Sequence, residues 1–138
     1  MHQKKTANKK VLLVANSSVI NEAAIVHGLN FSHRMNASLE VLQLIRTETA
    51  SSAAQSFEAN RVKSGRSEQI EYIQLIKEKD LTKELIDYAG SRRNLLCVIL
   101  CEQGDEQAKG TRKRQERFNE ITRVLSCPVV LYTDTPVY

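Results

Sequence analysis

The chain has 138 residues, of which 41% are hydrophobic and 26% are charged, and it contains only five glycines and two prolines. This composition is typical of one soluble globular domain with a continuous core, and it argues against a disordered or fibrous chain. No apolar stretch reaches the roughly 20 residues of a membrane span, and the N-terminus lacks the apolar segment of a secretion signal, so we expect a cytoplasmic protein without a membrane span.

The formal net charge of +4 lies in the first ten residues, which carry four lysines and no acid, so the rest of the chain is neutral overall. We predict that residues 1–9 form a flexible basic tail and that residues 10–138 form a single domain. An alternative use of the tail, together with residues 112–117, is binding of nucleic acid or a membrane surface. Because no aromatic residues interleave with these charges, we rank this alternative last and expect no DNA or RNA partner.

The first apolar run and the segment after it predict a strand and a helix. Residues 11–15, "VLLVA", form a nearly uninterrupted apolar run, typical of a central parallel strand covered on both faces. Asn16, Ser17 and Ser18 follow, and each is able to cap a helix N-terminus. Asn36 is expected to end this helix, because asparagine tolerates the left-handed conformation. The inward face of the helix is predicted at Ala24, Gly28, Phe31 and Met35.

Two further strands flank a segment with a weak pattern. Residues 39–45, "LEVLQLI", and residues 70–76, "IEYIQLI", each predict a strand. Between them, residues 47–65 contain few large apolar groups, so we expect any helix there to be short and weakly packed. Its inward face is predicted at Ala53, Ala54, Phe57 and Val62.

The last part of the chain predicts two more helices and two more strands. Asp80 is a candidate N-cap for a helix that stops near Gly90 and Asn94. Residues 95–101, "LLCVILC", predict the most apolar strand, and residues 127–132, "CPVVLY", predict the last one. The two helices have apolar positions on one face each, at Leu81, Leu85, Ile86 and Ala89, and at Phe118, Ile121, Val124 and Leu125.

This alternation of strands and helices predicts an α/β fold, in which right-handed crossovers build a doubly wound, five-stranded parallel sheet with helices on both faces. The ligand crevice of such a sheet lies at the carboxyl ends of the strands, where the strand order reverses. The loops that face it follow the first and fourth strands, at residues 16–18 and 101–118.

Three long stretches of the chain share their layout with a known family. They are "KKVLLVANSSVINEAAIVHGLNFSHRMNASLEVLQLI", "KDLTKELIDYAGSRRNLLCVIL" and "ITRVLSCPVVLY". This layout, with Cys-Pro-Val opening the last strand, resembles the universal stress proteins over nearly the whole chain. The resemblance implies an adenine-nucleotide alpha-hydrolase-like fold with the sheet order 3-2-1-4-5, and a regulatory role in stress response.

The nucleotide-binding motif of that family is incomplete in this chain. Members that bind ATP carry an acid after the first strand, and after the fourth strand they carry a glycine, two residues, a glycine, nine residues and then Gly-Ser or Gly-Thr. These glycines let backbone N–H groups approach the phosphates at the start of a helix. Here the motif positions hold other residues: Asn16 and Ser17, then Glu102 and Asp105, then Gln115 and Glu116.

We therefore expect no ATP cofactor. The alternative is a nucleotide-binding switch, for ATP or AMP, with a degenerate phosphate loop supported by the Arg/Lys run at residues 109–117. Its binding residues would be Asn16, Ser17, Ser18, Gly104, Gly110 and Thr111.

No constellation for catalysis or metal binding is evident, so we predict that the chain is not an enzyme and holds no metal. The three histidines are dispersed at positions 2, 27 and 33. Cys97 and Cys101 are expected to share a strand face at a separation too large for a disulfide, and Cys127 stands apart. We interpret these cysteines as buried structural thiols.

The leading hypothesis is therefore a regulatory protein that acts through homodimerisation and an unknown protein partner. Dimers of the resembled family commonly pair their last strands across a two-fold axis. The corresponding edge here is apolar and would otherwise expose unpaired backbone. It consists of Val129, Val130, Leu131 and Tyr132.

Overall fold

The computed structural model describes residues 9–66, 68–77, 80–102 and 111–133, with only the backbone described at 102, 111–114 and 133. The elements in chain order are β1 Lys10–Ala15, α1 Glu22–Arg34, β2 Ser38–Ile45, the 3-10 helix η1 Thr47–Thr49, α2 Ala50–Lys63, β3 Ile70–Ile76, α3 Leu81–Ala89, β4 Leu95–Glu102, α4 Thr111–Val124 and β5 Val129–Thr133.

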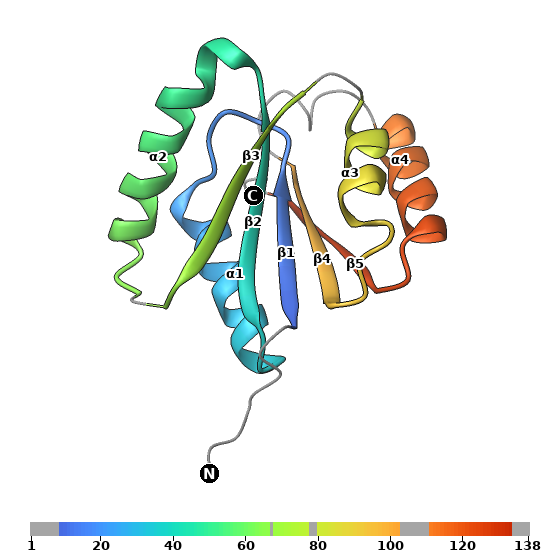
Figure 1. Cartoon of the computed structure of the whole chain (residues 1–138), viewed down its shortest axis with the longest axis horizontal. Coiled ribbons are helices and arrows are strands. Elements are labelled where there is room, and N and C mark those ends of the chain that lie inside the picture. Colours follow the sequence, from blue (N-terminus) through green and yellow to red (C-terminus); the bar gives the residue numbers. More distant parts are fainter. Residues whose placement is uncertain (1–8, 67, 78–79, 103–110, 134–138) are drawn as a thin grey trace.

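The strands form one parallel five-stranded sheet with the order β3-β2-β1-β4-β5, which confirms the predicted class and order. Helices α1 and α2 cover one face of the sheet, and α3 and α4 cover the other (Figure 1). The strand order reverses around β1, so the carboxyl ends of β1 and its neighbours form the expected crevice. Within the described part of the chain, no helix has the length and hydropathy that crossing a bilayer requires.

Alternate residues of the central strand β1 belong to two separate cores. Val11 and Leu13 pack in the core that α1 and α2 cover, whereas Leu12 and Val14 pack in the core beneath α3 and α4. Successive side chains of a strand point to opposite faces, so a strand covered on both sides needs apolar residues at every position. This requirement explains the continuous apolar run at residues 11–15.

Helix α1 begins later than the sequence predicts. Its N-cap is Asn21, whose Oδ1 accepts a hydrogen bond from the Ala24 N–H at 2.9 Å. The prediction that one of residues 16–18 caps the helix is therefore wrong, because these residues lead into an irregular segment that buries Ile20. The predicted end is confirmed, since Asn36 has a φ of 56°, in the left-handed region. The predicted inward face is also confirmed: Ala24, Gly28, Phe31 and Met35 pack against the core.

Helix α2 spans 14 residues, so the prediction of a short helix is wrong. Ala53 and Phe57 are buried as predicted, but Val62 is 63% exposed and does not face inward. The segment is rich in alanine, which favours a helix without a broad apolar face. A polar contact adds to this packing, because Asn60 Nδ2 donates a hydrogen bond to the Ile20 carbonyl at 2.9 Å.

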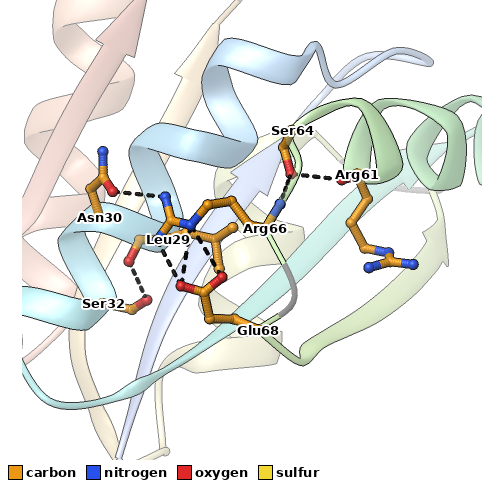
Figure 2. A network of polar contacts seen from close by, with 7 residues as sticks. All are labelled: Leu29, Asn30, Ser32, Arg61, Ser64, Arg66 and Glu68. Atoms are coloured by element: carbon orange, nitrogen blue, oxygen red, sulfur yellow. Dashed lines mark hydrogen bonds and ion pairs between the residues drawn. The ribbon is translucent and has the colours of Figure 1, made fainter.

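The chain that leaves α2 is tied back to α1 (Figure 2). Arg66 Nη1 donates to Asn30 Oδ1 at 2.9 Å, and Arg66 Nη2 donates to Glu68 Oε2 at 2.7 Å. Ser64 Oγ donates to the Arg61 carbonyl at 2.6 Å and accepts from the Arg66 N–H at 3.3 Å. The side-chain contacts of Arg66 are solvent-exposed, so they fix the path of the turn into β3 more than they stabilise the fold.

The C-terminal elements follow the sequence closely. Asp80 caps α3, since its Oδ1 accepts a backbone N–H of the first helical turn at 2.9 Å, and Gly90 is the C-cap. In α4, Val124 is 48% exposed, so its assignment to the inward face is wrong. Strand β5 begins at Val129, later than the predicted residue 127.

Candidate functional site

A pocket of about 300 Å³ lies where β1, β2 and β3 end, at the carboxyl edge of the sheet. The first-loop residues singled out from the sequence do line it. Sequence analysis missed the residues that follow β2 and β3, although their positions directly after apolar runs mark the same edge. The lining residues are Asn16, Ser17, Ser18, Leu44, Ile45, Arg46, Thr49 and Lys77.

The pocket is positively charged. Lys77 Nζ donates a hydrogen bond to Asn16 Oδ1 at 2.7 Å, so the carboxyl end of β3 is joined to that of β1. Arg46 adds a second exposed cation at the end of β2. Among the lining residues that the structure describes, there is no carboxylate to offset these charges. The pocket is therefore suited to an anionic group rather than to a cation.

The loop that forms one wall of this pocket is held from within the sheet. Gln43 is fully buried on β2, and its Nε2 donates a hydrogen bond to the Ser17 carbonyl at 2.7 Å. Ser17 Oγ in turn donates to the Val19 carbonyl at 2.7 Å, which closes a tight turn in the loop. These bonds explain why the segment after β1 is ordered without being helical.

Gln43 belongs to a partly buried chain of hydrogen bonds, the amide–tyrosine relay, formed by Gln43, Tyr72 and Gln74. The Tyr72 hydroxyl donates to Gln43 Oε1 and accepts from Gln74 Nε2 at 2.9 Å. Gln74 Nε2 also donates to the Ala50 carbonyl at 2.9 Å, and the Tyr72 ring stacks on Phe57 with a centroid distance of 4.3 Å. The relay thus joins the loop after β1 to the start of α2, on two sides of the pocket.

A second buried polar group, the Glu40 cluster, lies toward the amino ends of the strands and consists of Glu40, Tyr88 and Arg92. Glu40 is only 2% exposed, and Arg92 donates to both of its carboxylate oxygens at 2.9 Å. The Tyr88 hydroxyl donates to the same carboxylate. Burial of Glu40 favours its neutral form, but the hydrogen bonds from Arg92 and Tyr88 outweigh this and hold its pKa below the ordinary value.

The structure describes only part of the second predicted loop, residues 101–118. Gly104 and Gly110 lie outside the described residues, as do the side chains of Thr111 and Arg112. Helix α4 begins at Thr111, so residues 115 and 116 lie inside the helix rather than at its start. The two residues that stand at the Gly-Ser positions of the resembled motif, Gln115 and Glu116, therefore do not lie at a helix start.

The cysteines occupy core positions. Cys97 and Cys101 are buried in the same core cluster, which confirms that they share a strand face, and Cys127 is half-buried. Burial raises the pKa of Cys97 to about 11 and also raises that of Cys127. Such thiols stay protonated and are poor nucleophiles. In the described part of the chain, no three potential metal-ligating side chains gather in one place.

Strand β5 forms one edge of the sheet and pairs with β4 on its other side. Leu131 on this strand is 40% exposed, and its neighbours Val129, Val130 and Tyr132 are half-buried. No described strand lies beyond β5, so this edge places an apolar side chain at the border of the described sheet.

The sequence matches no family model, and no curated protein matches it. A comparison with solved structures finds a universal stress protein in complex with cAMP, with a TM-score of 0.63 and 10% sequence identity. The similarity covers 92% of this chain and 98% of the other. It extends through the parallel sheet and its helices, so this chain has the fold of a universal stress protein.

Proposed function

We propose that this protein is a stress-response regulator that acts through pairing of two copies and recruitment of a protein partner, without an ATP cofactor and without catalysis. The observation that carries the proposal is strand β5, an apolar edge for which the described residues supply a neighbouring strand on one side only. Antiparallel pairing of two β5 strands across a two-fold axis would satisfy its backbone and cover Leu131. The likeness in fold to a universal stress protein supports the regulatory role.

Replacing Leu131 by lysine tests the paired edge. We expect the wild-type protein to sediment as a dimer at micromolar concentration, and Leu131→Lys to raise the dimer Kd at least about tenfold, because an edge lysine opposes strand pairing. Val62→Lys is the matched control, since Val62 is an exposed apolar residue on α2. Sedimentation of the wild type as a monomer, or equal loss of dimer in both variants, contradicts the proposal.

A second function is favoured by the charged pocket. Arg46 and Lys77 suit an anionic ligand, and the universal stress protein found by comparison is in complex with cAMP. In this alternative the chain is a nucleotide-binding switch whose phosphate contacts come from side chains instead of a glycine loop. One observation argues against an ATP site. Asn16 stands at the position where the resembled family carries an acid, and its Oδ1 already accepts a hydrogen bond from Lys77.

Thermal unfolding with added nucleotide separates the two functions. We expect saturating ATP to leave Tm unchanged, whereas a ligand at one hundred times its Kd would stabilise the fold by about 2.7 kcal/mol. A rise in Tm with ATP or cAMP that disappears in Lys77→Met, but persists in the control Lys63→Met on α2, would establish nucleotide binding and overturn the first proposal.

A further inference from the structure

His27 lies on α1 at the point where this helix covers the edge strand β5. Its imidazole packs against the Tyr132 ring with a centroid distance of 4.7 Å and an interplanar angle of 31°. On the other side it contacts Phe31, with a centroid distance of 5.9 Å. The imidazole therefore provides a contact between the helix and the last described side chain of β5.

One nitrogen of this imidazole is buried without a hydrogen bond. His27 Nε2 has no partner among the described residues and is shielded from solvent. A neutral imidazole bears this position at a modest cost, because an unprotonated ring nitrogen is an acceptor without a partner but carries no charge. A protonated imidazole would carry a buried N–H donor and a positive charge, and each of these requires a partner.

The surroundings of His27 oppose such a charge. Arg34 on the same helix lies over the Phe31 ring, with 5.5 Å between its Cζ atom and the ring centroid, so this aromatic group already holds one cation. The other titratable groups in the same core are Tyr72 on β3, Tyr132 on β5 and the thiols of Cys97 and Cys101 on β4. In the described part of the chain, no carboxylate is seen to offset the charge; burial and then Arg34 lower the pKa of His27.

We propose that His27 is a pH-sensitive latch between α1 and β5: the neutral ring holds Tyr132 and the edge strand against the helix, and protonation opens this contact. The pKa of His27 is lowered in the closed state from its ordinary value of 6.5. The closed contact is therefore fully stable above about pH 6.5 and is lost as the pH falls toward the lowered pKa, by up to about tenfold in population for each pH unit.

The consequence for assembly rests on the proposed function. If two copies pair through β5, opening of the latch frees the strand that carries Tyr132 and Leu131. Acidification would then dissociate the dimer. The latch itself concerns contacts within one copy, so it can be tested whether or not dimers form.

Hydrogen exchange and histidine NMR test the latch in the full chain. We expect the His27 imidazole to titrate with a midpoint below 6.5. We also expect the amides of Val130 and Tyr132 to exchange up to about tenfold faster at pH 5.5 than at pH 6.5, after correction for intrinsic rates. His27→Phe keeps an aromatic ring in place but cannot be protonated, so its β5 amides should show no such acceleration. His33→Gln, which removes an exposed imidazole from the same helix, should behave as the wild type.

Two results would overturn the latch. One is a His27 midpoint at or above 6.5, which is measured in the wild type and needs no variant. The other is an equal acceleration of β5 exchange in wild type and His27→Phe. Sedimentation of the same samples at pH 7.5 reports separately on the dimer: loss of pairing at that pH with an intact latch contradicts the proposed function alone.

Discussion

We expect Arg92→Met to lower the free energy of unfolding by about 3 kcal/mol at pH 7, because it leaves the buried Glu40 carboxylate without its cation. Methionine approximates the apolar stem of arginine, so the loss reports on the charge more than on packing. Tyr88 still donates one hydrogen bond to Glu40 in the variant, and this bond limits the loss. Urea unfolding of the two proteins under identical conditions measures the difference.

The pH dependence of this loss gives a sharper test. In the wild type the pKa of Glu40 is held below its ordinary value of 4.5, so its contribution is present above that value and fades as the pH falls. Without Arg92, only the Tyr88 hydrogen bond and the charge of Lys10 oppose the effect of burial, so the Glu40 carboxyl becomes easier to protonate. The deficit of the variant should therefore be largest at neutral pH and shrink toward pH 4.5.

The exposed pair Glu58 and Arg61 on α2 provides the control. Their side chains lie 2.6 Å apart at the surface, where an ion pair contributes little. Arg61→Met should therefore change the free energy of unfolding by less than about 0.5 kcal/mol. Equal effects of Arg92→Met and Arg61→Met, or a deficit that grows on acidification, would show that the Glu40 charge is not what Arg92 stabilises.

The second large effect is expected for Gln43→Leu in the amide–tyrosine relay. Leucine fits the volume of the buried side chain but leaves the Ser17 carbonyl and the Tyr72 hydroxyl without their hydrogen bonds to Gln43. We expect a loss of about 2 kcal/mol in the free energy of unfolding. Since the bond to Ser17 holds the pocket loop, hydrogen exchange at residues 17–20 should rise beyond the global effect.

A double variant shows whether the relay acts as a unit. Tyr72→Phe removes the second partner, so Gln43→Leu combined with Tyr72→Phe should cost less than the sum of the two single changes. Gln55→Leu on the exposed surface of α2 is the control and should be nearly neutral. Strict additivity, with no added exchange in the loop, would mean that Gln43 does not position the pocket wall.

The sequence predicted the sheet well because its central strands β1 and β4 are apolar on both faces. In β1, residues 11–15 are apolar throughout, a pattern that only a covered parallel strand requires. Helix boundaries were harder to predict, since Asn16, Ser17, Ser18 and Asn21 are equally good caps by residue type. What selects Asn21 is the burial of Ile20, which depends on the packing of α2 and not on local pattern.

The candidate site was predicted only in its first loop. Residues 16–18 were found because they follow β1, and the same reasoning applied to β2 and β3 would have found Arg46 and Lys77. Glu40 and Gln43 are a different case. They lie in a predicted buried strand, and their partners Arg92 and Tyr72 are distant in sequence, so no local pattern indicates which charge or amide they meet.

The two borders of the sheet differ in charge, and this difference bears on how far the proposed pairing of copies would extend. β3 carries the exposed apolar side chain of Ile76 but also the carboxylate of Glu71, which pairs with Lys10 of β1 at 2.8 Å, whereas β5 presents Leu131 and carries no charged residue. Joining β5 of one copy to β3 of the next would repeat without end and produce fibres, but it would bring an apolar strand against a solvated charge. Joining β5 to β5 is self-limiting. The asymmetry therefore favours a finite pair over a growing polymer.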